Sequence, residues 1–316
     1  MRVDFGLSPR RPDAEERPAL LTIGNFDGVH RGHRALIDEL VRQARERDGE
    51  AVVMTFDPHP RCVLDPDNCP QQLTTLDEKR DLLARAGVDR LVVLEFTRTL
   101  SRWSAEHFCE QLLASLRLVR LVVGHDFALG HKRRGDLPFL RDFGASHGFD
   151  VVTVDALQER GEVVSSSLVR SALLSGDLLR ANRGLGHPYF LDGWVENVDA
   201  ASRFAGFPTA HPAITPGKCL PARGVYATWL RVGDDWRMSA TNVGYGPTFG
   251  GNRLTVETLL LDAAVELHRQ PVRVAFVGRL REERRYPDAG ALAAQIESDV
   301  HAARRQLSRH REPSGI

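Results

Sequence analysis

Short apolar runs alternate with amphipathic stretches over the first half of the chain, and this alternation restricts the fold more than any other feature. Between residues 29 and 47 the apolar positions recur with helical spacing, and Asp48-Gly49 predicts the end of that helix. The same analysis predicts strands at 18–23, 51–56, 90–96, 120–123 and 150–154, and helices at 29–47, 77–86, 104–116, 137–147 and 167–174. Strands that alternate with helices indicate an α/β fold with a parallel sheet covered on both faces.

The pattern changes near residue 183, where short strands and Gly/Pro turns replace the alternation. Residues 224–232 and 236–243 flank Gly233-Asp234-Asp235 and predict a hairpin. Two further strands and a last helix at about 288–307 indicate a small closed antiparallel β-barrel with a C-terminal helix. We therefore expect a polar N-terminal extension at 1–17, an α/β domain at 18–185 and a barrel domain at 186–316.

Charge and hydropathy exclude several classes of protein. Lys+Arg and Asp+Glu both total 42, whereas a protein that neutralises many nucleic-acid phosphates carries a basic excess or stripe. The longest apolar runs are far shorter than the roughly 20 residues that span a bilayer, and the polar N-terminus lacks the apolar core of a secretory signal. We expect a cytoplasmic protein with no nucleic-acid or membrane partner.

The cysteines give a prediction of their own. Cys62, Cys69, Cys109 and Cys219 show no CxxC spacing. Because structural zinc sites and disulfide frameworks have recognisable spacings, we expect neither, and we interpret all four as reduced and mostly buried thiols.

The segment GNFDGVHRGH, residues 24–33, lies between the first predicted strand and the first predicted helix. A helix N-terminus favours phosphate because its N–H groups are unpaired and carry partial positive charge. Gly28 and Gly32 allow close backbone approach, and His30 and His33 lie three residues apart on one face of the first turn. Both imidazoles can donate hydrogen bonds to a phosphate under attack. The alternative is a pair of surface histidines that happen to flank a helix start.

Four ordered motifs give the chain a family resemblance. GNFDGVHRGH resembles the HxGH signature of the Rossmann-like nucleotidyltransferases, in the form found in bacterial bifunctional riboflavin kinase/FMN adenylyltransferases, also called FAD synthetases. TFDPHP at 55–60 resembles the loop after the second strand of that family. GHDFALG at 124–130 resembles its GxDFxFG segment, and VSSSLVR at 164–170 resembles its ISSTxIR segment, with Ser167 for Thr.

The resemblance implies roles for individual residues. His30 and His33 would contact the ATP phosphates and stabilise the transition state, and Arg170 would hold the departing pyrophosphate, a task for which its rigid fork of donors is suited. The residues that would bind ATP are Gly24, Phe26, Asp27, Gly28, Gly32, Ser166 and Ser167. Those that would bind the flavin are Phe56, Asp57, Pro58, His59, Asp126 and Phe127.

Several of these residues have a structural alternative from the sequence alone. Phe56 and Phe127 are also typical of core packing. Asp126 could orient the substrate or a magnesium-bound water, or it could cap its loop. Asp27 and Asp57 are equally typical of turns. The implied reaction joins the AMP part of ATP to FMN, with magnesium bridging the triphosphate oxygens.

The second half resembles the riboflavin kinase domain of the same family. Glu257 would accept the proton of the riboflavin 5′-hydroxyl as it attacks the γ-phosphate of ATP. Thr209 would hold magnesium and ATP phosphate, and Asn242 would bind the flavin. A solvated strand face for Glu257 and a turn for Thr209 are the structural alternatives.

The ATP loop of the second half departs from the family pattern GxVxxGxGxGRxLGFPTAN. Val198, Ala200 and Ser202 stand where the family has glycines, and glycine permits the close backbone approach that a β-branched residue resists. His211 replaces an asparagine that ligates magnesium, and Gly246 replaces an arginine. Because histidine suits softer metals, we expect a kinase half that is weak, altered in substrate or inactive.

Two other functions remain open from the sequence. The enzyme could act on a flavin analogue or another phosphorylated cofactor precursor, or the second half could only bind flavin or a partner. The intact His30, His33 and Arg170 argue for catalysis in the first half. Weak self-association is the one protein–protein contact that we expect.

Overall fold

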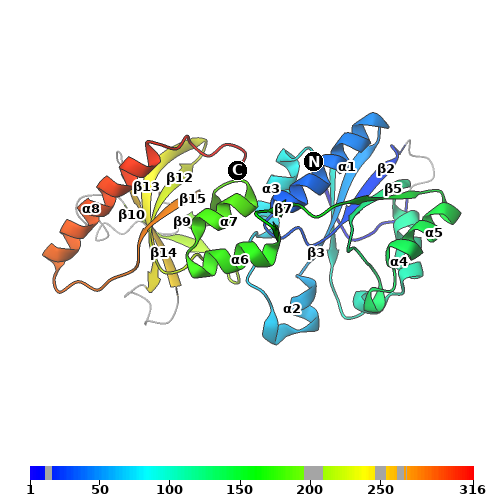
Figure 1. Cartoon of the computed structure of the whole chain (residues 1–316), viewed down its shortest axis with the longest axis horizontal. Coiled ribbons are helices and arrows are strands. Elements are labelled where there is room, and N and C mark those ends of the chain that lie inside the picture. Colours follow the sequence, from blue (N-terminus) through cyan, green and yellow to red (C-terminus); the bar gives the residue numbers. More distant parts are fainter. Residues whose placement is uncertain (11–15, 196–208, 246–253, 262–266, 268) are drawn as a thin grey trace. The chain divides into compact units, whose positions relative to one another are not determined.

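The structure is a computed structural model that describes residues 1–10, 16–195, 209–245, 254–261, 267 and 269–316. The chain divides into two compact units, Met1–Ser165 and Ser166–Ile316, and each is described by itself. The elements of both units are labelled in Figure 1. No described helix is long and apolar enough to cross a membrane.

The first unit is built on a six-stranded parallel sheet with the order β1-β4-β3-β2-β5-β6. Its strands are β1 (Arg2–Phe5), β2 (Ala19–Ile23), β3 (Glu50–Asp57), β4 (Arg90–Glu95), β5 (Leu118–Gly124) and β6 (Asp150–Val154). The central strand β2 is buried at every position, as expected for a parallel strand covered on both faces. The predicted α/β fold is therefore confirmed.

Helices cover the sheet, and short polar side chains start most of them. They are α1 (Arg31–Glu46), α2 (Pro60–Leu64), α3 (Leu76–Arg85), α4 (Ala105–Ser115) and α5 (Leu137–His147), with 3₁₀ turns at Pro66–Asn68, Leu100–Arg102 and His131–Arg133. Ser104 and Asp136 cap α4 and α5 by accepting a backbone N–H of the first turn. A two-stranded hairpin, β7 (Gln158–Glu159) and β8 (Glu162–Val163), follows β6.

Two predictions about the first unit need correction. Residues 1–17 were expected as a polar extension, but β1 pairs in parallel with β4 and so belongs to the sheet. Cys62 and Cys69 form a disulfide, with Cα atoms 4.3 Å apart, because α2 and the 3₁₀ turn after it fold the chain back. The expectation of reduced thiols is wrong for this pair, whereas Cys109 and Cys219 are free and buried.

The second unit holds a seven-stranded antiparallel sheet with the order β10-β14-β13-β12-β15-β9-β11. Its strands are β9 (Tyr189–Val195), β10 (Thr209–Ala210), β11 (Pro212–Ile214), β12 (Gly224–Val232), β13 (Asp235–Tyr245), β14 (Leu254–Leu260) and β15 (Gln270–Arg281). The edge strands β10 and β11 are separated in the chain by His211 alone, so the sheet must curl until its edges approach. This near-closed barrel confirms the predicted architecture.

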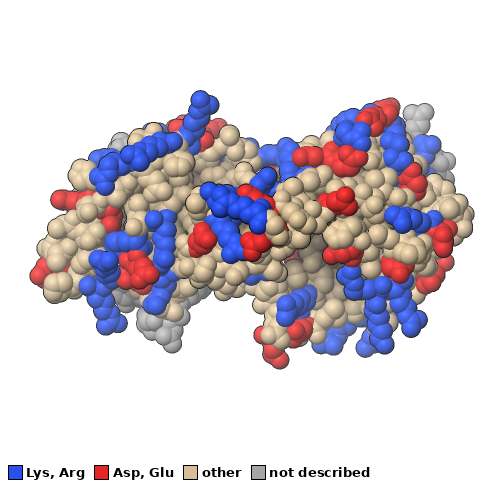
Figure 2. Space-filling view, in the orientation of Figure 1, with Lys and Arg blue, Asp and Glu red and all other residues tan. Residues whose placement is uncertain are grey.

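Three helices complete the second unit, namely α6 (Ser166–Ser175), α7 (Leu178–Leu185) and α8 (Ala289–Leu307). The sequence predicts a domain boundary after residue 185, whereas the compact units meet between Ser165 and Ser166, so that α6 and α7 fall within the second unit. Asn182 of α7 explains the difference, because its amide donates to the carbonyl of Phe276 in β15 and accepts from the N–H of Tyr189 in β9. On the face drawn in Figure 2, basic and acidic side chains are interspersed over both units.

Candidate active site

The segment at residues 24–33 leads from the end of β2 through a loop into the first turn of α1, as the sequence predicts. Three of its residues have left-handed backbone conformations, with φ of 47° at Phe26, 82° at Gly28 and 40° at Val29. Such conformations are costly for a β-branched residue and persist where surrounding contacts enforce them, often at functional sites. The loop is therefore held in one defined shape.

Asp27 supplies the contacts that hold the loop. Its side chain is 4% exposed, and its Oδ1 accepts from the N–H groups of Leu73 and Thr74 at 2.8 and 3.1 Å. The hydroxyl of Thr74 in turn accepts from the N–H of Gly28 at 3.0 Å. This geometry supports the turn role that the sequence left open for Asp27, because the carboxylate fastens the loop to the segment before α3.

His30 and His33 lie together at the first turn of α1. His30 is the N-cap residue, and its Nδ1 accepts from the backbone N–H of His33 at 3.3 Å. An imidazole that accepts at Nδ1 carries its proton on Nε2 when neutral, so the outer nitrogen of His30 is a donor. The two rings stack with centroids 3.5 Å apart, and the edge of Phe26 packs on His33 at 5.1 Å.

Both histidines are neutral at physiological pH. Burial lowers the pKa of His30 to about 4, and the nearby carboxylate of Asp27 only partly opposes this shift. Burial also lowers the pKa of His33 well below its usual range, and the neighbouring His30 and Lys79 lower it further. The pair can thus donate hydrogen bonds to an anion without carrying charge.

The shifted pKa of His30 predicts a pH-dependent stability. Between pH 6.5 and about 4 the unfolded chain binds a proton at His30 that the folded chain resists, so acidification lowers the free energy of unfolding there. This loss of stability is absent above pH 6.5 and reaches its full value of about 3 kcal/mol below about pH 4. Urea unfolding from pH 7 to 4 should show this component in the natural chain and not in His30→Asn, which keeps an N-cap side chain. Identical pH profiles for the two chains would contradict it.

Gly32 lies where the loop is crowded. A Cβ at this position would meet the carbonyl oxygen of Val164 at 3.1 Å and the ring of His30 at 3.2 Å. Neither neighbour can move without displacing the histidine pair or the backbone, and a displacement of about 1 Å at a catalytic group can reduce a rate about 10²-fold. We expect Gly32→Ala to slow product formation by about tenfold or more. An unchanged rate in a chain that unfolds at the same temperature would refute this.

A cavity beside the loop gathers three of the residues predicted to bind flavin. Phe56, Asp57 and His59 line it, and the other lining residues are Asp27, Gln72, Thr74, Leu76 and Lys79. Asn25 ties the two loops together through a contact between its Nδ2 and the Nε2 of His59 at 3.3 Å. The first unit thus joins the HxGH and TFDPHP segments around one cavity.

Other predicted flavin-binding residues lie outside this lining. Pro58 follows a cis peptide bond after Asp57 and is exposed. Phe127 is half-buried against the core of the unit, in agreement with the packing alternative. The side chain of Asp126 is exposed, and its carbonyl accepts from Arg133 at 2.6 Å.

Ser166, Ser167 and Arg170 occupy the first turns of α6. Residues three and four apart share a helix face, so the three side chains form one polar group at that end of the helix. They begin the second unit, whereas Val164, whose carbonyl oxygen lies close to Gly32, belongs to the first. The role of this group in holding pyrophosphate stays a prediction.

Lys79 is a residue of the cavity that the sequence analysis missed. It lies on α3 and is 8% exposed. A lysine in a helical pattern ordinarily marks the solvent face, so the residue type argues against a buried position. The one available signal was its spacing to Leu82 and Leu83, which places it on the buried face of the helix.

The predicted kinase residues meet on three neighbouring strands of the barrel. Asn242 of β13 is paired with Glu257 of β14, and Thr209 of β10 is paired with Leu259 of β14. The hydroxyl of Thr209 is buried and has no hydrogen-bond partner among the described residues. His211 lies with its Nδ1 at 3.9 Å from Oε1 of Glu257. Val198, Ala200, Ser202 and Gly246 lie outside the described residues.

Within the described ranges, no group of three or more His, Cys, Asp or Glu side chains could hold a metal ion. The buried hydroxyl of Thr209 is a hard oxygen donor of the kind that Mg²⁺ prefers, whereas the imidazole of His211 suits a softer ion. The donors of the second unit thus fit magnesium in part.

Comparison with known proteins also divides the chain into two parts, and the second part begins at residue 185, where the sequence predicts the domain boundary. Residues 13–168 match a family described as FAD synthetase, and residues 185–307 match one described as riboflavin kinase. The Escherichia coli K12 protein named bifunctional riboflavin kinase/FMN adenylyltransferase is 38% identical to this chain, and the match covers 92% of this chain and 93% of that protein. The corresponding protein of Pseudomonas fluorescens is 36% identical, over 96% and 97% of the two chains. That of Bacillus subtilis is 33% identical, over 94% and 95%.

A solved structure shares the fold. The crystal structure titled as a macrolide-efflux protein from Streptococcus pneumoniae superimposes with a TM-score of 0.85 and covers 96% of this chain and 99% of its own. Its sequence is 24% identical, so the likeness concerns the fold alone.

Proposed function

We propose that this chain, which belongs to the family of bifunctional riboflavin kinase/FMN adenylyltransferases, makes FAD by transferring AMP from ATP to FMN. The first unit would carry this transfer, and the second would carry a riboflavin kinase site that is impaired. The observation that supports the transfer best is the stacked, neutral pair His30 and His33 at the N-terminus of α1.

The chemistry follows from what these groups can donate. A phosphate oxygen of FMN attacks the α-phosphorus of ATP, a new P–O bond forms there, and the bond to the bridging oxygen of the β-phosphate breaks to release pyrophosphate. Negative charge increases on the α-phosphate and on the leaving oxygens. The Nε2–H of His30 and the backbone N–H groups at the start of α1 are fixed donors for such charge.

Alignment and charge neutralisation supply the rest of the acceleration. Two anions must be brought into line, and a site that binds both removes most of the entropy that their encounter would cost. Mg²⁺, when bound to the triphosphate, would offset part of its charge. Ser166, Ser167 and Arg170 would hold the β- and γ-phosphates as they leave.

In the second unit Glu257 would take the proton of the riboflavin 5′-hydroxyl, and Thr209 would hold the metal and phosphate. The imidazole of His211 lies beside Glu257, where the family has the shorter asparagine. Together with Val198, Ala200 and Ser202, this change supports a kinase that is slow, selective for another substrate, or replaced by simple flavin binding.

One experiment separates these functions. The full chain is incubated with ATP, magnesium and either riboflavin or FMN, and the flavins are separated by chromatography. FAD from FMN, with little or none from riboflavin, is the expected result. Rapid FAD formation from riboflavin would show a fully active kinase, and no FAD from either substrate would refute the proposed transfer and leave a flavin analogue as the acceptor to test.

A further inference from the structure

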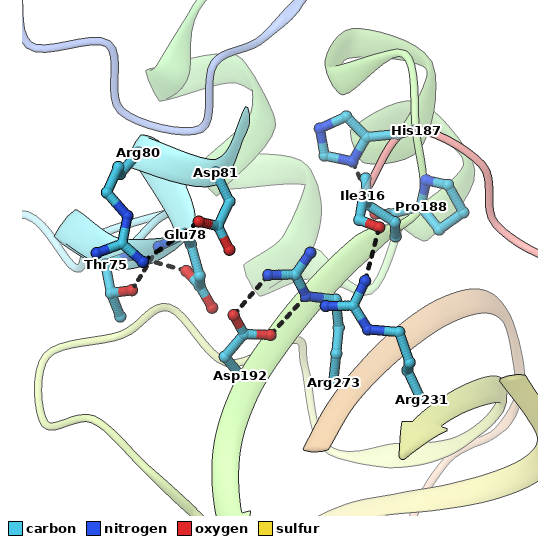
Figure 3. A network of polar contacts seen from close by, with 10 residues as sticks. All are labelled: Thr75, Glu78, Arg80, Asp81, His187, Pro188, Asp192, Arg231, Arg273 and Ile316. Carbon is cyan, nitrogen blue, oxygen red and sulfur yellow. Dashed lines mark hydrogen bonds and ion pairs between the residues drawn. The ribbon is translucent and has the colours of Figure 1, made fainter. Parts of the chain in front are cut away.

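Helix α3 buries a lysine on the face where apolar side chains belong. Lys79 is 8% exposed and shares that face with Leu82 and Leu83. The helix is firmly started by a capping box, in which Thr75 and Glu78 exchange hydrogen bonds at 3.2 and 2.8 Å, as Figure 3 shows. Because removing an ammonium group from water is costly, its position on a rigid helix needs an explanation.

The contacts of Lys79 connect it to both loops of the candidate active site. Its Nζ lies 3.3 Å from Oγ1 of Thr55, the first residue of the TFDPHP segment. The same hydroxyl donates to the carbonyl of Asn25 in the HxGH loop at 3.1 Å. Lys79 also lines the cavity that Phe56 and His59 share. The ammonium group thus lies between the predicted ATP and flavin sites.

Two carboxylates near Lys79 partly offset the cost of burying its ammonium group. Burial lowers the pKa of Lys79, while Asp27 and Asp57 oppose this shift. The charge of Lys79 contributes to keeping His33 neutral. Two neutral imidazoles supply hydrogen bonds but no charge, although both substrates of the proposed reaction are anions.

Among the described residues of the first unit, Lys79 is the one lysine or arginine that is buried. Its neighbour Arg80 is exposed and forms surface ion pairs with Asp77 and Asp81. A buried cation in a cavity attracts an anionic ligand far more strongly than an exposed cation does, because water does not screen its charge.

We propose that Lys79 is the cationic ligand of the flavin 5′-phosphate, and that it holds the attacking phosphate beside the histidine pair. The inference rests on the proposed AMP transfer. Phe56, Asp57 and His59, which the sequence predicts to contact the flavin, line the same cavity as Lys79. The ammonium forms a charge-assisted hydrogen bond and transfers no proton, so the phosphate keeps its charge for the attack.

Replacement of Lys79 by methionine tests this role, because methionine keeps a similar length without the charge. We expect the KM for FMN to rise by about tenfold or more, with a lower kcat and a KM for ATP that changes by less than about threefold. Arg80→Met is the matched control, since it removes one positive charge from the exposed face of the same helix. It should leave all three constants unchanged.

The outcomes separate this role from a structural one. If Lys79→Met unfolds more easily but keeps the natural KM for FMN and kcat, Lys79 is only a counterion for Asp27 and Asp57, and the proposal fails. Failure of the proposed AMP transfer would appear instead as absence of FAD formation in the natural chain.

A measurement on the natural chain applies even if Lys79→Met does not fold. The chain has three lysines, Lys79, Lys132 and Lys218, so the side-chain signals of a ¹³C-lysine-labelled sample can be resolved by NMR. Lys79→Arg assigns the signal of interest. With α,β-methylene ATP present, FMN should shift the Lys79 signal and riboflavin, which lacks the phosphate, should not. No shift with FMN, or an equal shift with both flavins, would overturn the proposal.

Discussion

Alanine in place of both His30 and His33 should slow the formation of FAD from FMN and ATP by about 10³-fold or more. Removal of one fixed donor from a site of developing negative charge costs about 10²- to 10³-fold in rate, and the stacked pair acts as a unit, so the two losses will not simply multiply. Single-turnover assays with FMN, ATP and magnesium would measure the change.

Two controls separate catalysis from folding in this experiment. His30→Asn retains a side chain that can accept the N–H of His33 and should preserve most of the stability while the rate falls. His107→Ala removes an exposed histidine from α4 and should change neither property. A double alanine variant that folds and makes FAD at the natural rate would show that the pair is not part of the catalytic machinery.

Riboflavin phosphorylation should increase by about tenfold or more when Val198, Ala200 and Ser202 are changed to glycine together with His211→Asn. One hydrogen bond to a charged group contributes about 1.5–3 kcal/mol, which corresponds to about 10- to 150-fold in rate. The glycines would allow backbone N–H groups to approach the phosphates, and asparagine would return an oxygen ligand beside Thr209. Formation of FMN from riboflavin, ATP and magnesium is the measurement.

Glu257→Gln in the restored variant provides the control, because it removes the expected general base and should abolish the gain. FAD formation from preformed FMN should stay the same in all of these chains. If the natural chain already phosphorylates riboflavin rapidly, and the four changes do not increase the rate, the lost glycines do not impair the kinase.

The sequence predicts those parts of the fold whose side chains are patterned by burial. The central strands of the first unit are continuous apolar runs, and α1 carries its apolar residues at helical spacing. By contrast, β1 is partly exposed and follows no apolar pattern, so its pairing with β4 depends on contacts far away in the chain. The same holds for α7, whose place beside the barrel depends on Asn182 and its partners on two strands.

The site residues also divide into those that local geometry predicts and those that depend on tertiary contacts. The proximity of His30 and His33 could be predicted, because residues three apart at a helix start lie on one face. Lys79 was missed, because its spacing to two leucines is its one sequence signal and the depth of its burial depends on the tertiary structure. The Cys62–Cys69 bridge also depends on a local fold that cysteine spacing does not encode.

The fate of the three phosphates of ATP tests the central claim most directly. In a reaction with FMN, a label on the α-phosphate should appear in FAD, and a label on the γ-phosphate should appear in pyrophosphate in equal amount. Transfer of the γ-phosphate label to a flavin, or the absence of the α-phosphate label from every flavin product, would contradict AMP transfer by the His30/His33 site.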